Sequence, residues 1–250
     1  MTHTSIAAVR FTEGTLRVGS IISRSASVLS RHFLAFFIVS LMGYLPTLLM
    51  ARTLFAEPLD QALSVQGSRV LGLVGFIVLS TLGDAVIMHA AFQDVRRRPV
   101  RLAESLNVGL RRFLPIVGFA FVAFFLIWLG LILLIIPGLI LYTMWFVGLP
   151  ACVIERLGPW RSLRRSRELT KGHRWKLFGL ALLLLITSLG GLLIHFGLSA
   201  VAGPVVGLIG RLIWRGIWGA FATVVVTVTY HDLRMAKDGG DIEQIAVVFD

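Results

Sequence analysis

The most informative absence in this sequence is the lack of charge over a long central stretch. No Asp, Glu, Lys or Arg occurs from Phe113 to Ile154. As a helix at about 1.5 Å per residue, this stretch would be roughly 63 Å long, about twice the hydrocarbon thickness of a bilayer. A water-soluble core has no use for such a run, whereas lipid makes charge costly. The stretch therefore predicts two membrane spans folded back on each other, with the turn at Pro137-Gly138.

Cysteine and the residue patterns of common catalytic motifs are also scarce. Cys152 is the only cysteine, which excludes an internal disulfide and leaves too few thiols for a cysteine-built zinc or iron–sulfur site. No Walker sequence, nucleophile elbow, HExxH or EF-hand spacing occurs, so we expect no metal ion and no cofactor. Met1–His32 carries arginines and lacks a short apolar core followed by a cleavage site, so no removable signal peptide is predicted.

Charged residues of either sign are few. They make up 15% of the 250 residues, while 56% of the residues are hydrophobic and the mean hydropathy is +0.85. Most of the chain can therefore be solvated by lipid, and little remains for an aqueous domain. We expect a single membrane domain at residues 1–232, followed by a short cytoplasmic tail at 233–250.

Acidic residues are outnumbered by basic ones, which gives a net charge of +11. Nucleic-acid-binding proteins share this property, so the positions of the basic residues decide its meaning. Most of the Lys and Arg residues fall in segments 1–32, 93–112 and 155–176, and the connections between them are nearly bare. This alternation is the positive-inside pattern. It predicts a multi-pass protein of the bacterial cytoplasmic (inner) membrane with both termini in the cytoplasm, and it argues against nucleic acid as a partner.

The apolar runs predict an all-α, polytopic integral membrane protein with six transmembrane helices in three hairpins. The expected spans are Phe33–Phe55, Val70–Phe92, Phe113–Ile136, Gly138–Ile154, Leu177–Val201 and about Leu212–Tyr230. Gly203-Pro204 is expected to form the outer turn before the last span, and Arg211 and Arg215 to reach the outer interface. In an alternative, residues 200–210 dip partly into the membrane, because they are apolar but too few to cross it.

A basic amphipathic segment precedes each hairpin, which suggests an internal repeat. In the first segment an arginine recurs every seven residues from Arg10 to Arg31, which lines one stripe of a helix. In the second, apolar residues have helical spacing from Leu102 to Leu110, and in the third Pro159 suits a first helical turn. We expect all three segments to be interfacial helices that lie along the membrane surface. The three repeats are expected at about residues 10–92, 95–154 and 158–232.

One set of residues, spread over nearly the whole chain, has the pattern of a known family. Its members are Tyr44-Leu-Pro46, Pro137, Gly138, Pro150, Glu155, Gly158, Ser162, Leu163, Ser166, Leu169, Lys171, Gly172, Trp175 and Tyr230-His-Asp-Leu-Arg234. This pattern resembles the membrane domain of the glycerophosphoryl diester phosphodiesterase family, together with the related YciC-like inner-membrane proteins. The resemblance implies an integral membrane module in which these residues are structural. The catalytic barrel of the family needs about 250 further residues, so we expect no phosphodiesterase activity.

The basic segments supply the candidate binding residues. Arginine dominates over lysine, and its planar guanidinium suits bidentate contact with phosphate. The candidate contacts with anionic lipid headgroups are Arg97, Arg98, Arg101, Arg161, Arg164, Arg165, Arg167, Lys171 and Arg174. In an alternative, the segments are only topology signals and interfacial anchors. An unidentified membrane or cytoplasmic protein is a further candidate partner.

Asp84 is the candidate polar site within the membrane. It lies inside the second expected span, where a carboxylate normally faces the helix bundle or a wet cavity. Either it forms a hydrogen bond to a neighbouring helix, or it marks a polar path or ligand contact. His89 follows five residues later, about 140° away around the helix, so we expect no joint site.

The densest polar group follows the fourth expected span. We expect Glu155 to pair with Arg156, Arg161 or another loop arginine and so to fix the turn after the fourth span. Ser162 and Ser166 are four residues apart and share one helical face, where they are expected to contact a neighbouring helix or a phosphate.

The sequence favours a non-catalytic membrane protein with a structural or lipid-linked scaffold role. A transporter or permease component with a polar path near Asp84 is the alternative, because repeats with broken helices also build substrate paths. A membrane-embedded lipid enzyme would need convergent acid, base or metal groups, which the sequence does not show.

Overall fold

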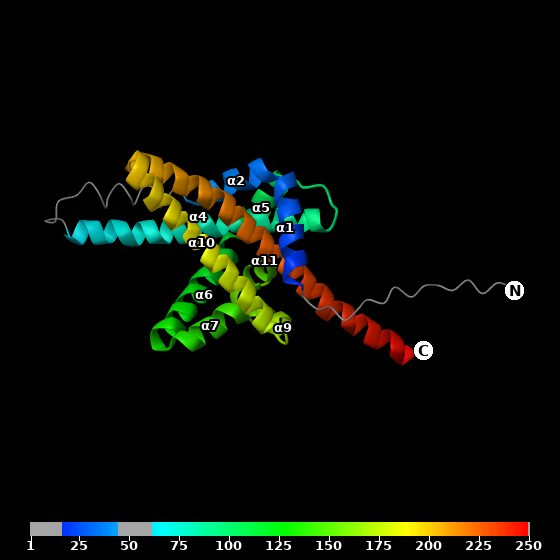
Figure 1. Cartoon of the computed structure of the whole chain (residues 1–250). Coiled ribbons are helices and arrows are strands. Elements are labelled where there is room, and N and C mark those ends of the chain that lie inside the picture. The colour runs from blue at the N-terminus through cyan, green and yellow to red at the C-terminus, as the bar shows by residue number, and fades with distance from the viewer. Residues whose placement is uncertain (1–16, 45–61, 250) are drawn as a thin grey trace.

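The structure is a computed structural model that describes the backbone of residues 17–44 and 62–249 and the side chains of residues 17–44 and 70–238. Within these ranges every regular element is an α-helix (Figure 1). The helices are α1 (Val18–Arg31), α2 (Phe33–Met42), α4 (Ala62–Val95), α5 (Leu102–Arg111), α6 (Phe113–Leu133), α7 (Ile135–Met144), α8 (Gly148–Ile154), α9 (Pro159–Thr170), α10 (Arg174–Ala202) and α11 (Pro204–Phe249).

Helix length and composition confirm the predicted all-α polytopic membrane protein. Among the described residues, five helical stretches are long and apolar enough to cross a bilayer, namely Val70–Val95, Phe113–Leu133, Ile135–Ile154, Arg174–Ala202 and Pro204–Asp238. α1 and α2 together form a sixth candidate that is bent by 92°. Residues 45–55 of the first expected span lie outside the described residues.

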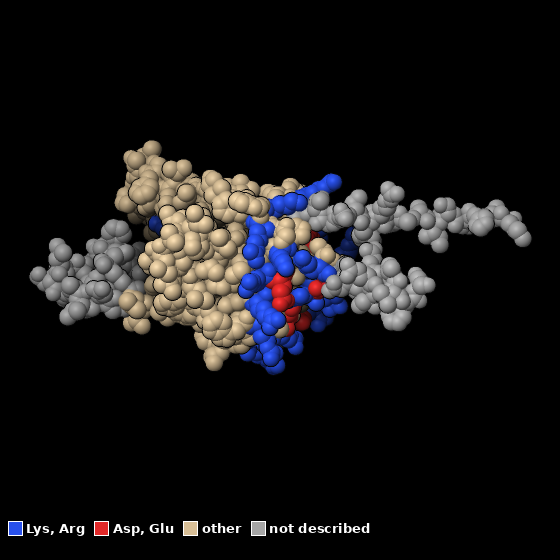
Figure 2. All heavy atoms as spheres, turned by 90° about the horizontal axis from the view of Figure 1, so that it is seen from below, with Lys and Arg blue, Asp and Glu red and all other residues tan. Residues whose placement is uncertain are grey.

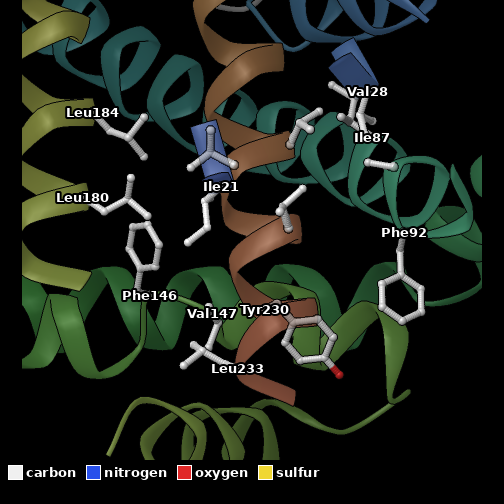
Figure 3. Packing of buried hydrophobic residues seen from close by; sticks show 14 of the residues in the cluster. Ile21, Val28, Ile87, Phe92, Phe146, Val147, Leu180, Leu184, Tyr230 and Leu233 are labelled. Carbon is white, nitrogen blue, oxygen red and sulfur yellow. The ribbon is translucent and has the colours of Figure 1, made fainter. Parts of the chain in front are cut away.

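α11 is the central helix of the bundle. It contacts α1, α2, α4, α8, α9 and α10, and Figure 1 shows it crossing α1 and running beside α10. In Figure 3, Ile21 of α1, Phe92 of α4 and Leu180 of α10 are grouped around α11, which contributes Tyr230 and Leu233. This cluster joins segments that lie far apart in the sequence, so the packing of α11 positions the elements of both sites described below.

The turn between α6 and α7 is apolar and uncovered by protein. Ile132, Leu133, Leu134, Ile135 and Ile136 each expose 66–74% of their surface. In water, such exposure would cost about 25 cal/mol for each Å² of apolar surface, whereas in lipid it costs nothing. This hairpin therefore has the surface of a membrane-embedded element.

The turn itself lies at Leu134, and its predicted position at Pro137-Gly138 is wrong. Leu134 has extended backbone (φ −159°, ψ 132°) and α7 begins directly after it. Pro137 therefore stands in the first turn of α7, where its missing N–H leaves no helical hydrogen bond unmade. Gly138 allows close helix approach instead, because an added Cβ would lie 2.7 Å from the backbone nitrogen of Leu131. Proline and glycine favour a turn and also suit the first turn of a tightly packed helix, which explains why the turn was predicted at the wrong position.

The fourth expected span, Gly138–Ile154, is broken into α7 and α8. Pro150 accounts for the break, because it has no N–H to donate to the carbonyl four residues earlier. The Gly148 N–H donates to the Trp145 carbonyl at 2.9 Å. The Met144 carbonyl, which Gly148 would bond in a continuous helix, is thereby left to side-chain donors.

The turn between α10 and α11 agrees with the prediction at Gly203-Pro204. Gly203 has φ +90°, a left-handed conformation that suits glycine after a helix, and Pro204 is the first residue of α11. Residues 200–210 complete α10 and begin α11, so they form no separate segment between the two helices. The alternative in which they dip partly into the membrane stays a prediction. α11 is also longer than the expected span and continues as helix to Phe249.

The three expected interfacial helices, α1, α5 and α9, lead into the following helix through bends of similar geometry. The residues at these bends are His32 (φ −123°, ψ 27°), Arg112 (φ −108°, ψ 20°) and His173 (φ −117°, ψ 8°). A fully buried serine lies seven residues before each bend, at Ser25, Ser105 and Ser166. These shared features support the internal repeat that the sequence predicts.

Candidate functional site

Basic side chains form a belt around one end of the apolar body, which Figure 2 shows as a blue band beside the tan surface. Its described members from the three basic segments are Arg17, Arg24, Arg31, Arg96, Arg97, Arg98, Arg101, Arg111, Arg112, Arg156, Arg161, Arg164, Arg165, Arg167, Lys171, Arg174 and Lys176. We call this set the basic belt. The fold thus brings together three basic segments that are separated by the apolar helices.

Ion pairs hold α1 against this end of the bundle. Asp94 of α4 lies 3.2 Å from Arg31 and 3.4 Å from His32, at the bend between α1 and α2. Asp232 of α11 pairs with Arg24 of α1. α1 is therefore fixed to the end of α4 and to α11.

Glu155 is the centre of the densest polar network. Nε of Arg165 lies 3.1 Å from both carboxylate oxygens of Glu155, and the Tyr230 hydroxyl donates to Oε1 at 2.6 Å. Nη2 of Arg165 also donates to both carboxylate oxygens of Asp238, at 2.9 and 3.0 Å. Burial lowers the pKa of Arg165, but the hydrogen bonds to Asp238 and Glu155 raise it, and the net direction is upward. Glu155 does pair with an arginine, but the partner is Arg165 of α9 and neither Arg156, Arg161 nor another loop arginine. The network joins α8, α9 and α11.

Ser162 and Ser166 lie on the buried face of α9, as their spacing predicts. The Ser166 hydroxyl donates to the Met144 carbonyl at 2.9 Å, and the Thr170 hydroxyl, one turn later, donates to it at 3.3 Å. The Ser162 hydroxyl donates to the Gly158 carbonyl of its own helix at 2.9 Å. The neighbour of this face is therefore the broken α7–α8 segment, whose free carbonyl the α9 hydroxyls satisfy.

A concave, open site of about 700 Å³ lies where α9 ends and α10 begins. We call it the basic hollow, and its lining consists of Arg164, Arg167, Glu168, Lys171, Gly172, Arg174 and Trp175. Glu168 pairs with Arg164 at 3.2 Å. Nε of Arg174 is buried without a hydrogen-bond partner among the described residues. Trp175 exposes 86% of its surface, so a cationic concavity lies beside an uncovered indole ring.

The remaining predicted headgroup contacts are spread along the basic belt. Arg97, Arg98, Arg101 and Arg161 are exposed, whereas Arg165 is engaged by protein carboxylates. Arg97 and Arg156 have positive φ, 55° and 56°, which is uncommon for residues other than glycine. Each lies just beyond α4 or α8, so the two loops that lead to α5 and α9 begin alike.

Asp84 lines a cleft of about 340 Å³ between α2, α4, α7, α10 and α11. Its Oδ1 accepts a hydrogen bond from the Thr223 hydroxyl of α11 at 2.7 Å. Arg215, two turns earlier on α11, also lines the cleft and lies over the Tyr44 ring, 4.3 Å from the ring centroid. Asp84 therefore makes the predicted hydrogen bond to a neighbouring helix and also faces a cleft. A polar path or ligand contact at Asp84 stays a prediction.

His89 belongs to a different contact. Its Nδ1 lies 3.0 Å from the Ser105 hydroxyl of α5, on another face of α4 from the bond between Asp84 and Thr223. Within the described side chains, no three His, Cys, Asp or Glu residues lie in a group that could hold a metal ion.

Several contacts of the two sites had no signal in the sequence. Tyr230 belongs to the family pattern, but nothing there pairs it with Glu155, and Asp238 was not singled out. Both complete the Glu155 network from α11, which is distant in sequence. Thr223 is one of many hydroxyl residues in apolar helices. Arg215 stands out as a charge inside an apolar run, but sequence reasoning places it at the outer interface, whereas the structure places it in the cleft over Tyr44.

Comparisons of the chain with family models, curated proteins and solved structures give no match. The resemblance to the membrane domain of the glycerophosphoryl diester phosphodiesterase family therefore stays a prediction.

Proposed function

We propose that this chain is a non-catalytic module of the bacterial inner membrane whose cytoplasmic face binds anionic lipid headgroups, with the basic hollow as the main contact. The observation that carries this proposal is the excess of cations at one end of an apolar helical body. In this proposal the module has a structural or lipid-linked scaffold role, and the basic belt marks the cytoplasmic side.

The carboxylates of this end neutralise only one of the four cations that line the basic hollow. Asp94, Asp232 and Asp238 pair with arginines outside the hollow, and Glu168 pairs with Arg164. Among the described residues, Arg167, Lys171 and Arg174 lie within ion-pair distance of no carboxylate. The negative potential of a cytoplasmic leaflet attracts such charges by about 1 kcal/mol for each Lys or Arg near the surface.

Exposed apolar side chains next to the basic belt support its position at the membrane surface. Leu102, Leu106 and Leu110 form one stripe along α5 and are all exposed, while Ser105 and Gly109 on the other face are buried. Trp175 likewise stands uncovered at the start of α10. Leucine and tryptophan in these positions suit the boundary between headgroups and acyl chains.

The network around Glu155 supports a preformed site. Arg165 is held from two sides by Glu155 and Asp238, and it lies on the same helix as Arg164 and Arg167. α9 is therefore fixed to α8 and α11, and the other cations of the helix keep their positions at the hollow. A site that is organised in advance loses less conformational entropy when a phosphate binds.

The test is mass spectrometry of the lipids that co-purify with the full-length protein in mild detergent. Arg167→Gln and Lys171→Gln are each expected to lower the bound phosphatidylglycerol and cardiolipin about fivefold, as expected from roughly 1 kcal/mol per charge. Arg211→Gln is the matched control, because this exposed arginine lies on α11 far from the basic belt. Equal amounts of anionic lipid on all three variants and the parent would contradict the proposal.

A transporter or permease component is the second candidate, and the cleft at Asp84 favours it. Ser80 lines this cleft, whereas Ala85, the residue directly after Asp84 on the same helix, is fully buried. In a Cys152→Ala background we expect Ser80→Cys to react with a membrane-impermeant thiol reagent in proteoliposomes. Ala85→Cys is the matched control. If both cysteines are equally unreactive from either side, the cleft is not part of a water-filled path.

A further inference from the structure

The cleft at Asp84 is a second polar site, remote from the basic belt. Asp84 lies 11 residues, or about 16 Å of helix, before Val95 at the belt end of α4. Arg215 lies 11 residues after Pro204, at the opposite end of α11. Both charged groups therefore lie well inside the apolar part of the bundle, where charge needs a specific partner.

Among the described residues, no carboxylate lies within ion-pair distance of Arg215. Its guanidinium rests on the face of the Tyr44 ring at 4.3 Å, a contact that stabilises a cation without neutralising it. Its Nε is buried and has no hydrogen-bond partner among the described residues. A guanidinium in this setting presents donors in the planar arrangement that matches a phosphate or a carboxylate.

The other end of the cleft offers hydrogen-bond acceptors. Asp84 receives one hydrogen bond from Thr223 through Oδ1, and its second carboxylate oxygen remains for a donor on a ligand. Arg215 and Thr223 are eight residues apart on α11, which corresponds to about 12 Å of helix rise. A ligand that suits both ends carries an anionic group and, beyond it, a hydroxyl or ammonium donor.

The cleft opens sideways toward lipid. Tyr142 of α7 and Leu185 of α10 both line it, and they expose 43% and 56% of their surfaces. Leu185 lies 11 residues from the start of α10 and 17 from its end, so the opening is at the level of acyl chains. An occupant that enters here comes from the bilayer.

From these observations we propose that the cleft holds the headgroup of a glycerophospholipid, with the phosphate on Arg215, a headgroup donor on Asp84, and the acyl chains leaving between α7 and α10. This site uses different residues from the basic hollow and is independent of the function proposed above.

The test is a titration of the detergent-solubilised, full-length protein with phosphatidylglycerol or phosphatidylcholine, followed by native mass spectrometry. The background is Arg167→Gln with Lys171→Gln, which removes charge from the basic hollow. In this background Arg215→Gln is expected to weaken phosphatidylglycerol binding roughly tenfold or more, as expected for loss of a charged hydrogen bond. Arg211→Gln, the matched control one turn away, is expected to change it less than twofold. Phosphatidylcholine, which has no headgroup donor, is expected to bind more weakly than phosphatidylglycerol.

A second variant guards against loss of folding in Arg215→Gln. Leu185→Trp fills the lateral opening and leaves every polar group of the cleft in place, so it is expected to lower phosphatidylglycerol binding while the helical circular dichroism stays unchanged. Competition with excess glycerol 3-phosphate distinguishes a phospholipid headgroup from a soluble phosphate as the occupant of the cleft. The lipid is expected to stay bound in its presence, and full displacement would assign the cleft to a soluble phosphate and overturn the proposal.

The outcomes for the two sites are distinguishable. Equal phosphatidylglycerol binding by Arg215→Gln and Arg211→Gln overturns the cleft proposal and leaves the basic hollow untouched. An unchanged lipid content in Arg167→Gln and Lys171→Gln contradicts the hollow and leaves the cleft proposal standing.

Discussion

Removal of Arg165 is expected to loosen the belt end of the protein far more than removal of its neighbour Arg164. The Arg165 guanidinium contacts both oxygens of Glu155 and both oxygens of Asp238 at 2.9–3.1 Å. Arg165→Gln therefore leaves Glu155 without its cation, while Asp238 keeps its pair with Arg234 at 3.2 Å. The Tyr230 hydroxyl stays on Glu155 but carries no charge.

The magnitude follows from the burial of these groups. Breaking a buried ion pair by removing one partner costs about 3–5 kcal/mol. The side chain of Arg165 is 25% exposed, and those of Glu155 and Asp238 are 15% and 41% exposed. Because water reaches part of the charge left behind, we expect Arg165→Gln to lower the free energy of unfolding by about 2 kcal/mol.

The matched control is Arg164→Gln. Arg164 and Glu168 form an exposed pair one turn apart on α9, and such pairs contribute about 0.3–0.5 kcal/mol. The assay is unfolding of the purified protein in mixed micelles with increasing sodium dodecyl sulfate, followed by far-ultraviolet circular dichroism. Glu155→Gln with Arg165→Gln should cost less than the sum of the single changes, because the double variant no longer contains the unpaired Glu155 carboxylate and Asp238 is still paired with Arg234. Arg165→Gln and Arg164→Gln variants of equal stability would refute this reasoning.

Three further predictions concern packing and topology. Gly138→Ala should lower the free energy of unfolding by about 2 kcal/mol because its Cβ meets the backbone of α6, while Gly179→Ala, with open space around it, should be neutral or stabilising in the same detergent titration. Ser166→Ala and Thr170→Val each remove one hydrogen-bond donor from the Met144 carbonyl. Ser166→Ala should lower the free energy of unfolding by about 1 kcal/mol, and the double variant should lower it by more than either single change. Losses of under about 0.3 kcal/mol for each single change that simply add in the double variant would argue against this role. Fusion reporters in the loops after α4 and α8 should report the same side of the membrane, and opposite sides would contradict the proposed topology.

The membrane fold was predictable because lipid imposes a simple requirement. Charge-free runs longer than the bilayer thickness have to be spans, and clusters of arginine have to lie at their ends. The bends at His32, Arg112 and His173 follow basic amphipathic segments that were visible in the sequence. What failed was the turn at Pro137-Gly138, because proline and glycine suit a turn and also a tightly packed first helical turn.

The polar contacts were predictable only where sequence neighbours meet. Glu155 lies ten residues from Arg165, so its pairing with a nearby arginine followed from local charge, although the partner lies on α9 and not in the loop. Thr223 and Asp84 meet across 139 residues, and nothing in the local pattern of either helix selects the other. Arg215 was visible as a charge in an apolar run, yet its position over Tyr44 depends on how α2 packs against α11.

The three bent junctions give the protein unequal cross-sections on its two sides. α1, α5 and α9 have 14, 10 and 12 residues, which at about 1.5 Å per residue and about 10 Å diameter corresponds to roughly 500 Å² of surface when they lie flat. A bilayer that holds this protein must make that room in one leaflet only. In the proposed topology the protein has the larger cross-section in the cytoplasmic leaflet, so we expect crowding of the protein in a flat bilayer to bend the bilayer away from that leaflet.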